Sequence, residues 1–383
     1  MNKKVVHIVL NPFIQDARVI RECTYLAKCG YEVTVIAYWM NGMELMEVQN
    51  GFNIRRISLM TKSWANISII QVLKFFEFLI KALMIIRKIK PDICHGHDPN
   101  GLLVAYFVKY IYKCKLIYDS HELWSDSMHM QGKKRIMFKI GRKIEKHLIK
   151  KTDAVITVNN SISEIILAEN DITSVTVIRN MPERSTDKFH NTREELEFPH
   201  CQFILIYVGN IERGRGIKKI IEAMNKVDNN IGLVLMGRDS VYKKEMETFS
   251  ESFNLESRIK FINTVLHHQV VNVCKLANVG IAPIQNMCKS YFLSLPNKIF
   301  EYIQAGLPVL ASDFPEMKKI IEDYSVGFTF DIEDTKQIAD IINLIYSDKN
   351  SYRSFCVNSK SASGSLNWDV EQSKLLSVYN ELN

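Results

Sequence analysis

The stretch Ser294–Asp313, SLPNKIFEYIQAGLPVLASD, decides the fold of the second half of the chain. Its first part is predicted to be a buried helix, because Pro296 suits a first helical turn and apolar residues follow at helical spacing. Ser294 is expected to cap this helix, and Gly306 to end it in the left-handed conformation. The apolar residues after Pro308 then predict a short buried strand. Alternation of helix and strand is typical of a parallel α/β sheet.

Two charged residues share one face of this helix. Lys298 and Glu301 lie three positions apart, so their side chains project from the same side. The N-terminus of a helix favours an anion, and a lysine beside it adds positive charge. A carboxylate one turn further on can accept hydrogen bonds from hydroxyl groups, so the pair suits the phosphate and diol of a ribose phosphate. The alternative is an exposed ion pair without a ligand, worth about a few tenths of a kcal/mol.

The same alternation runs along the whole chain and predicts two doubly wound α/β domains, each with a parallel sheet and Rossmann-like, that face a central cleft. The predicted strands are Val5–Leu10, Val33–Tyr38, Ile54–Ile57, Ile93–His95, Leu116–Tyr118, Ala154–Val158, Val175–Ile178, Phe203–Val208, Gly232–Met236, Ile259–Phe261, Val279–Ala282, Val309–Ala311 and Gly327–Phe330. The predicted organisation is an N-terminal domain over 1–180, a polar linker over 181–200, a C-terminal domain over 201–362, and a helix over 363–383 that packs back towards the N-terminal domain.

Composition bounds the class of protein. The chain has 383 residues, of which 47% are hydrophobic and 24% charged, as in ordinary globular proteins. Its 8 cysteines are scattered singly, which favours a reducing cytosol. The apolar run over 67–89 is interrupted by charged residues, so it is not expected to span a membrane. Residues 1–180 carry a net charge of +10 and residues 181–383 one of −3, which suggests that the first half faces a polyanion or an anionic membrane.

A glycine-rich turn follows the strand Phe203–Val208 in GNIERGRGIKKIIEA, residues 209–223. Gly209 ends the strand, and Arg215 stands between two glycines just before a predicted helix. Backbone that can approach a ligand, a helix N-terminus and an arginine together favour a phosphate. The spacing matches neither the dinucleotide motif nor the P-loop, and the alternative is a charged surface turn. Arg213 is expected to be merely solvated.

Histidines and acidic residues follow two strands of the first half. They occur in HGHDPNGLL, residues 95–103, and LIYDSHELW, residues 116–124. Such groups can bind sugar hydroxyls or serve as acids and bases. A zinc site of His95, His97 and His121 is an alternative, although their spacing is not that of a strong zinc motif. The chain contains no D-x-D, so we expect no metal clamp for a diphosphate and no metal cofactor.

A basic amphipathic segment spans residues 132–151, GKKRIMFKIGRKIEKHLIKK. Isoleucine or leucine recurs every fourth residue, while Glu145 is the lone acidic residue. The pattern is typical of a helix lying on an anionic membrane surface. The alternative is a domain helix with a solvated basic face. Binding to nucleic acid is not expected, because no aromatic stacking pattern accompanies the charge.

In this order, the motifs resemble those of the nucleotide-sugar-dependent glycosyltransferases of family 4, which have the two-domain GT-B architecture. The resemblance covers nearly the whole chain. Its most specific part is the Pro-Asn-Lys…Glu-Tyr…Ala-Gly-x-Pro-Val segment. The other parts are DARVIRECTYLAKCGYEVTVIA, YDSHEL, VIRN, YVGN…RGI and the C-terminal NWDVEQSKLLSVYNEL.

The resemblance implies roles for individual residues. Glu301 matches the family's glutamate that binds the donor ribose, and Arg215 matches the basic residue that binds the donor diphosphate. His121 matches a histidine near the donor sugar. The loop Ile262–Val265 matches the loop that holds the nucleotide base. The implied catalytic residues are His121, Arg215 and Lys298. The implied donor-binding residues are Gly209, Asn210, Arg215, Ile262, Val265, Asn297, Lys298 and Glu301, and those on the acceptor or sugar side are His97, Asp98, Asp119 and Glu122.

Two positions depart from the family pattern. A first glutamate is expected eight residues before Glu301, where this chain has Leu293. An arginine often follows the glycine of the first C-domain strand, and here that residue is Asn210. Both departures fall where the sugar and its phosphate would bind, and Lys298 is a candidate for the missing charge.

The resemblance implies a retaining, hexosyl-type glycosyltransferase that uses a UDP- or GDP-sugar as donor and needs no cofactor. It further implies a lipid-linked saccharide acceptor in cell-envelope polysaccharide synthesis, with the protein cytoplasmic and peripheral on the inner face of the membrane. One alternative is a nucleotide-sugar 2-epimerase, which needs no acceptor. Another is a non-catalytic sugar-nucleotide-binding partner subunit. The absence of G-x-G-x-x-G argues against a dehydrogenase.

Overall fold

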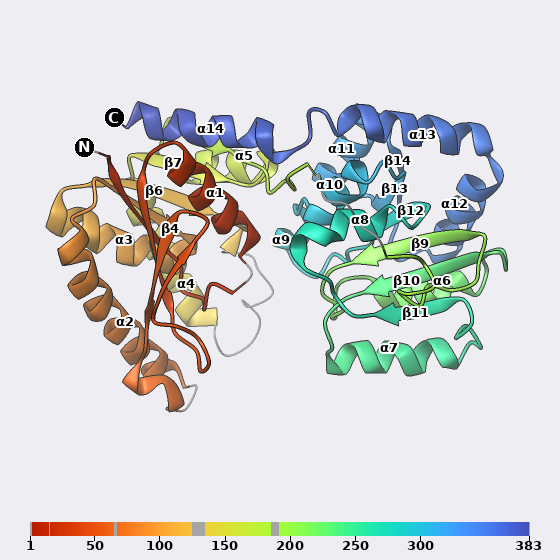
Figure 1. Cartoon of the computed structure of the whole chain (residues 1–383), viewed down its shortest axis with the longest axis horizontal. Coiled ribbons are helices and arrows are strands. Elements are labelled where there is room, and N and C mark those ends of the chain that lie inside the picture. The colour runs from red at the N-terminus through yellow and green to blue at the C-terminus, as the bar shows by residue number, and fades with distance from the viewer. Residues whose placement is uncertain (1, 15, 65–66, 125–134, 185–190, 383) are drawn as a thin grey trace. The chain divides into compact units, whose positions relative to one another are not determined.

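The computed structural model describes residues 2–14, 16–64, 67–124, 135–184 and 191–382, apart from the side chains of Ser68 and of residues 135–138. The chain forms two compact units (Figure 1). Unit 1 comprises Met1–Arg179 and Gln372–Asn383, and unit 2 comprises Asn180–Glu371. Both are α/β units with a sheet of mostly or wholly parallel strands, which confirms the predicted fold class.

Unit 1 is built on an eight-stranded sheet in the order β3-β4-β2-β1-β5-β6-β7-β8. Its strands are β1 Lys4–Ile8, β2 Glu32–Tyr38, β3 Met46–Gln49, β4 Phe52–Ile57, β5 Ile93–His97, β6 Lys115–Ser120, β7 Ala154–Thr157 and β8 Thr176–Val177. Its helices are α1 Ala17–Lys28, α2 Ser68–Ile89, α3 Asp98–Tyr112, α4 Arg135–Ile149 and α5 Asn160–Glu169, with a 3-10 turn at Met60–Ser63. Every strand pair is parallel except β3 with β4.

Unit 2 is built on a six-stranded, wholly parallel sheet in the order β11-β10-β9-β12-β13-β14. Its strands are β9 Phe203–Val208, β10 Ile231–Met236, β11 Ile259–Ile262, β12 Val279–Ala282, β13 Val309–Ser312 and β14 Gly327–Phe330. Its helices are α6 Ile217–Met224, α7 Val241–Glu251, α8 Val270–Cys274, α9 Lys289–Phe292, α10 Asn297–Gln304, α11 Pro315–Tyr324, α12 Thr335–Ser347 and α13 Lys349–Ala362, with a 3-10 turn at His267–Gln269. Helix α14, Trp368–Glu381, crosses the boundary between the units.

Apolar layers cover both faces of the sheet in unit 2. Residues of α8, α10 and α11 pack on one face, around Ile206 and Ala311. Residues of α6, α7 and α12 pack on the other, around Leu205 and Leu310. Neighbouring residues of one strand therefore belong to opposite cores, as the two-residue period of a strand requires. Burial on both faces is the reason that these strands are apolar throughout.

The structure tests the prediction for residues 294–313 in detail. Helix α10 begins at Asn297 and strand β13 at Val309, and Gly306 has φ 74°, so the left-handed helix end is confirmed. The expected cap is wrong. Pro296 occupies the N-cap position, and the Ser294 hydroxyl donates instead to the carbonyl of Tyr291 at 2.7 Å. A proline at the cap leaves the first N–H groups of α10 without a side-chain acceptor.

Two further features differ from the predictions. The antiparallel edge strand β3 was not predicted from the sequence. The segment 181–200 was predicted to be a linker, yet its described residues belong to unit 2, with Met181 and Phe198 buried in the core. Within the described ranges, no helix combines the length and apolarity needed to cross a membrane.

Candidate functional site

The predicted site residues of unit 1 lie at the carboxyl ends of β5 and β6. Strand order reverses between β1 and β5, and ligands of open parallel sheets bind at such a point. Helix α3 begins immediately after β5, and its first turn lies close to the backbone of β1. A Cβ atom on Gly101 would lie 2.7 Å from the carbonyl oxygen of Ile8, so only glycine allows this contact. Asp98, the first residue of α3, has φ 56°, a strained value for a residue other than glycine.

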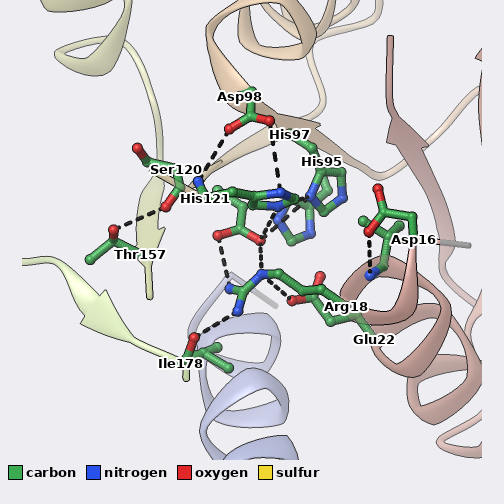
Figure 2. A network of polar contacts seen from close by, with 12 residues as sticks. Asp16, Arg18, Glu22, His95, His97, Asp98, Ser120, His121, Thr157 and Ile178 are labelled. Atoms are coloured by element: carbon green, nitrogen blue, oxygen red, sulfur yellow. Dashed lines mark hydrogen bonds and ion pairs between the residues drawn. The ribbon is translucent and has the colours of Figure 1, made fainter. Parts of the chain in front are cut away.

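A buried ion pair forms the base of this group (Figure 2). Arg18 of α1 is 3% exposed and Asp119 of β6 is 0% exposed. The arginine donates from Nε and Nη2 to the two carboxylate oxygens of Asp119 at 2.8 and 2.9 Å, and from Nη1 to the carbonyl of Ile178 at 2.7 Å. Burial alone would raise the pKa of Asp119, but the charge of Arg18 and the neighbouring His121 hold it well below its usual value.

His121 lies between two carboxylates. Its Nε2 is 3.2 Å from Oδ2 of Asp119, its Nδ1 is 3.8 Å from Oδ2 of Asp98, and its backbone N–H donates to Asp98. Burial alone would lower the pKa of this imidazole, but the charges of Asp98 and Asp119 outweigh burial and raise it to about 10. About a fifth of the side chain, 21%, remains exposed. The residue can therefore present an imidazolium to a ligand.

His97 connects this group to a second histidine cluster. Its Nδ1 lies 3.1 Å from Nε2 of His121 and 3.4 Å from Oδ2 of Asp119. Its Nε2 lies 2.9 Å from Nδ1 of His7. The ring of His95 stacks on that of His97, with centroids 4.4 Å apart. The structure thus brings together the predicted residues His97, Asp98, Asp119 and His121.

Other predicted features of unit 1 lie elsewhere. Glu122 lines a small pocket with Arg142 and Glu145 beside α4. The basic segment 132–151 lies partly outside the described residues, because α4 is described from Arg135 onwards. Of its basic side chains, Arg142 and Lys146 both form ion pairs with Glu169 of α5.

In unit 2 the strand order reverses between β9 and β12, and Gly209 directly follows β9. Lys298 of α10 approaches this point. The Nζ atom of Lys298 lies 3.5 Å from the ring centroid of Tyr207. A Cβ atom built on Gly209 would lie 3.4 Å from the same Nζ atom. Lys298 is 9% exposed, and its burial, followed by the charge of Arg215, lowers its pKa well below the usual value. The carboxylates of Glu301 and Glu212 act in the opposite direction but do not compensate.

Arg215 and Arg213 differ sharply in their surroundings. Arg215 stacks over the ring of Tyr291 at 4.8 Å and lies 3.1 Å from Glu212, with 27% of its side chain exposed. Arg213 is 77% exposed and makes a long ion pair of 3.4 Å with Glu245. The structure therefore places Arg215 beside the buried lysine and Arg213 in solvent.

The remaining predicted donor residues surround the same edge of the sheet. Glu301 is 7% exposed and lies one turn after Lys298, so the exposed-pair alternative is wrong. Asn297 is the first residue of α10, and the carbonyl of Asn210 accepts a hydrogen bond of 2.6 Å from the Tyr207 hydroxyl. Residues Ile262 and Val265, which flank the loop after β11, are half-buried against the core.

Several residues of these sites were not identified from the sequence. In unit 1 they are Arg18, Glu22, His7 and Tyr379, and in unit 2 Tyr207, Tyr291 and Glu212. A signal existed for Arg18 and Glu22, because charges four residues apart stand on the apolar face of an amphipathic helix. Tyr379 gave no signal, since it lies 372 positions from His7.

Comparisons with known proteins agree with this architecture. The chain matches the model for glycosyl transferases group 1 over residues 188–362 and the model for Glycosyltransferase Family 4 over residues 17–181. The structure is similar to sucrose-phosphate synthase from Thermosynechococcus elongatus, with a TM-score of 0.84, 18% identity, and coverage of 100% of this chain and 99% of that one. It is also similar to Anabaena HepE in complex with UDP-glucose, with a TM-score of 0.78, 14% identity and 99% coverage of both chains.

In sequence, the chain is similar to D-inositol 3-phosphate glycosyltransferase from Xylanimonas cellulosilytica, with 21% identity over 190 residues. That match spans 49% of this chain and 44% of the relative. The two family models adjoin and together cover most of both units. The chain therefore belongs to the family 4-type glycosyltransferases with the GT-B fold.

Proposed function

We propose that this protein transfers a hexosyl-type sugar from a nucleoside diphosphate sugar to a hydroxyl acceptor, with retention of the anomeric configuration. The observation that carries the proposal is the pair Lys298 and Arg215 at the strand-order reversal of unit 2. Lys298 is buried, and its pKa stays well below the usual value because the carboxylates of Glu301 and Glu212 do not offset burial and the charge of Arg215, so an additional anion would stabilise its charged form. The diphosphate of a donor supplies that anion.

The barrier in such a transfer is loss of the diphosphate from an oxocarbenium-like sugar. Lys298, Arg215 and the N–H groups that begin α10 stabilise the charge that develops on the leaving group. Glu301, one helical turn further on, accepts hydrogen bonds from the ribose hydroxyls. The loop after β11 holds the base. In unit 1, His121 and Asp98 bind hydroxyl groups of the acceptor or sugar. We assign no protein nucleophile.

We further propose that the donor is a UDP-sugar. Support comes from HepE, whose similar fold was solved with UDP-glucose, although at 14% identity that likeness concerns the fold. Calorimetry with UDP, GDP and ADP tests this directly. We expect UDP to bind at least tenfold more tightly than the other two. Tighter binding of GDP would assign the other nucleotide class.

A panel of acceptors with the preferred UDP-sugar tests the reaction itself. Glycosyl transfer predicts an acceptor-dependent release of UDP and a product whose anomeric proton has the coupling of the donor. A 2-epimerase instead releases UDP and free sugar without an acceptor. A non-catalytic partner subunit would bind the donor and transfer sugar to none of the acceptors. This outcome is included because the chain has Leu293 where the family pattern has its first glutamate.

We propose that the diphosphate is bound without a metal ion, since two cationic side chains already face it. Activity is then expected to survive a short exposure to excess EDTA. A loss that Mg²⁺ restores would contradict the proposal.

The acceptor, we propose, is lipid-linked, and unit 1 binds it at the inner face of the cell membrane during cell-envelope polysaccharide synthesis. Support comes from α2, whose outer face exposes a stripe of large apolar side chains. The stripe consists of Ile69, Val72, Leu73, Phe76, Ile80 and Met84, all at least 45% exposed. Exposed Arg87 and Lys88 follow at the end of the helix. An exposed apolar face beside basic residues suits an anionic membrane surface.

Sedimentation with vesicles tests the membrane proposal. Binding should require anionic lipid and decrease with salt, because each basic residue contributes about 1 kcal/mol within a Debye length. Phe76→Ser with Ile80→Ser should weaken it, whereas Val241→Ser, at an exposed apolar position of unit 2, should not. Lys133→Gln with Lys143→Gln tests the basic segment, and Arg142 is left intact because it forms an ion pair with Glu169. Equal binding to neutral vesicles, or none to either type, would favour a soluble acceptor.

A further inference from the structure

We propose that His7, Glu22, His95 and His97 form a binding site for one divalent transition-metal ion, of the zinc class, inside unit 1. One nitrogen or oxygen atom from each of the four residues lies within 4.8 Å of the others. All four are buried, with His97 the most exposed at 3%. The site is distinct from the proposed diphosphate site, whose residues lie in unit 2, and its member His97 also contacts His121.

The sheet register brings the histidines together. His7 of β1 is paired directly with His95 of β5 in the parallel register. His97 stands two residues further along β5, so it projects from the same face as His95. Glu22 lies on the buried side of α1, close to that face. Three imidazoles and one carboxylate therefore converge from three elements.

Three atoms of the cluster lack hydrogen bonds. Within the described residues, neither carboxylate oxygen of Glu22 nor Nε2 of His95 has a hydrogen-bond partner. Nε of Arg18 does lie 3.1 Å from Oε1 of Glu22, but it donates to Asp119 at 2.8 Å. The arginine thus offers Glu22 charge without a hydrogen bond. Buried polar atoms of this kind are costly unless a further partner is bound.

The second nitrogen of each imidazole, in contrast, already faces an oxygen atom. The Tyr379 hydroxyl lies 2.9 Å from Nδ1 of His95 and 3.3 Å from Nε2 of His7. Nδ1 of His97 lies 3.4 Å from Oδ2 of Asp119. Histidines that bind metals commonly have their other nitrogen held by a hydroxyl, carbonyl or carboxylate in this way. Nδ1 of His7, Nε2 of His95 and Nε2 of His97 remain for an ion.

The spacing of these atoms suits a small ion after slight adjustment. Nδ1 of His7 and Nε2 of His97 lie 2.9 Å apart, a distance at which one proton must bridge them when no ion is present. Tetrahedral zinc with bonds of about 2.0–2.1 Å separates its ligand atoms by about 3.3 Å. An ion would replace the bridging proton and also occupy the free positions on His95 and Glu22. Imidazole and carboxylate ligands favour zinc, cobalt or nickel over magnesium.

A second group, His97 with Asp119 and His121, also has its ligand atoms close together. It is the weaker candidate, because both oxygens of Asp119 already accept hydrogen bonds from Arg18. The zinc set considered as an alternative from the sequence, His95 with His97 and His121, is not among the groups that converge within the described residues. His97 is the member that both of the observed groups share.

Metal analysis of the full-length protein, with any affinity tag removed, tests the site. After partial unfolding in chelator and refolding with Co²⁺, we expect about one ion per chain and the visible absorption of tetrahedral cobalt. Glu22→Gln and His95→Gln should each weaken Zn²⁺ and Co²⁺ binding at least tenfold. The control is His267→Gln with His268→Gln, an exposed pair in unit 2 that could bind metal only adventitiously. Equal binding in the cluster variants and the wild type would overturn the proposal.

Thermal unfolding separates the metal site from an alternative in which Glu22 is protonated and no ion binds. The metal site predicts that Zn²⁺ raises the melting temperature of the wild type and that Glu22→Gln abolishes the shift. The alternative predicts no shift with Zn²⁺ and a Glu22→Gln variant at least as stable as the wild type, which would refute the site. Neither measurement depends on glycosyl transfer, so failure of the proposed activity leaves the test intact.

Discussion

Two basic side chains, the half-buried His121 of unit 1 and the buried Lys298 of unit 2, have pKa values shifted in opposite directions. In unit 1, His121 lies between Asp98 and Asp119, and these carboxylates raise its pKa to about 10 despite burial. In unit 2, burial lowers the pKa of Lys298, and the nearby Arg215 lowers it further. Desolvation disfavours the charged form at both positions, so the difference comes from the neighbouring charges.

In unit 1, carboxylates of the protein itself balance the charge of His121. In unit 2, the charge of Lys298 is not balanced in this way, and a bound anion would stabilise it. The cations of unit 1 are matched by Asp98 and Asp119, whose contacts hold His121 and Arg18 in position. Arg215 lowers the pKa of Lys298, and the carboxylates of Glu301 and Glu212 compensate only in part. The basic residues Lys298 and Arg215 of unit 2 therefore favour binding of an anion. The carboxylates of unit 1 instead hold the hydrogen-bond donor His121 in a fixed orientation.

Removal of the internal balance in unit 1 should have the largest effect. Arg18→Met leaves the buried carboxylate of Asp119 without its two hydrogen bonds and its counter-charge. Breaking a buried pair in this way costs about 3–5 kcal/mol. Urea unfolding should show this loss in the free energy of unfolding of unit 1.

The matched control is Arg142→Met, which breaks an ion pair with Glu169 whose side chains are 34% and 29% exposed. Exposed pairs contribute about 0–1 kcal/mol, so this variant should remain close to the wild type. Addition of Asp119→Asn to Arg18→Met should recover part of the lost stability, since it removes the unpaired charge. Equal stability of the two arginine variants would show that the buried pair contributes nothing.

In unit 2, loss of a cation should reduce catalysis rather than stability. Arg215→Ala and Lys298→Ala each remove charge beside the leaving diphosphate, and loss of one such group lowers turnover by about 100-fold. Lys298→Ala should leave the protein folded, because it removes a buried group whose charged form is disfavoured. Steady-state release of UDP gives the turnover number for each variant.

Arg213→Ala and Lys318→Ala are the controls, because both residues are substantially exposed and paired with surface carboxylates. Each should keep turnover within about twofold of the wild type. A loss in Arg213→Ala as large as that in Arg215→Ala would mean that the whole turn, rather than Arg215, responds to the mutation.

The fold was predictable where burial determines the sequence. The strands of the unit 2 sheet are mostly apolar because helices cover both faces, and the central strands of both sheets were predicted to within a few residues. Strand β3 was missed since its residues are mostly exposed and its sequence, MEVQ, has no apolar run. Strand β3 pairs antiparallel with β4 at the edge of the sheet. Neither the hydrophobic pattern nor the composition of a sequence shows which strand will pair with another.

The sites were predictable in part. The ends of predicted strands show which loops lie at the binding edge of a sheet, but they do not show which side chains of those loops touch one another. His97, Asp98 and His121 follow strands, and the sequence placed them correctly at one edge. The lowered pKa of Lys298 could not be predicted, because it depends on burial and on the charge of Arg215, which is distant in sequence. Likewise, the cluster of His7, His95 and Tyr379 depends on strand register and on the docking of α14.

Replacement of Glu301 should weaken donor binding by an intermediate amount. Glu301→Ala removes the proposed acceptor of the ribose hydroxyls, and loss of a hydrogen bond to a charged group costs about 1.5–3 kcal/mol. Calorimetry should therefore show weaker binding of UDP, with binding of inorganic pyrophosphate nearly unchanged. Equal weakening of both ligands would assign Glu301 to the electrostatic balance of Lys298 instead of the ribose.

The smallest expected effect is an uptake of protons when UDP binds. The diphosphate places negative charge beside Lys298 and raises its pKa, so the lysine carries more protons in the complex than in the free protein. Binding must then strengthen as the pH falls through the range between the two pKa values. Calorimetry in buffers with different ionisation enthalpies measures the uptake, which should reach at most one proton per UDP. Lys298→Met should abolish it, whereas Lys318→Met should not. Uptake that persists in Lys298→Met would belong to another group, and its absence in the wild type would mean that the lysine is already charged in the empty site.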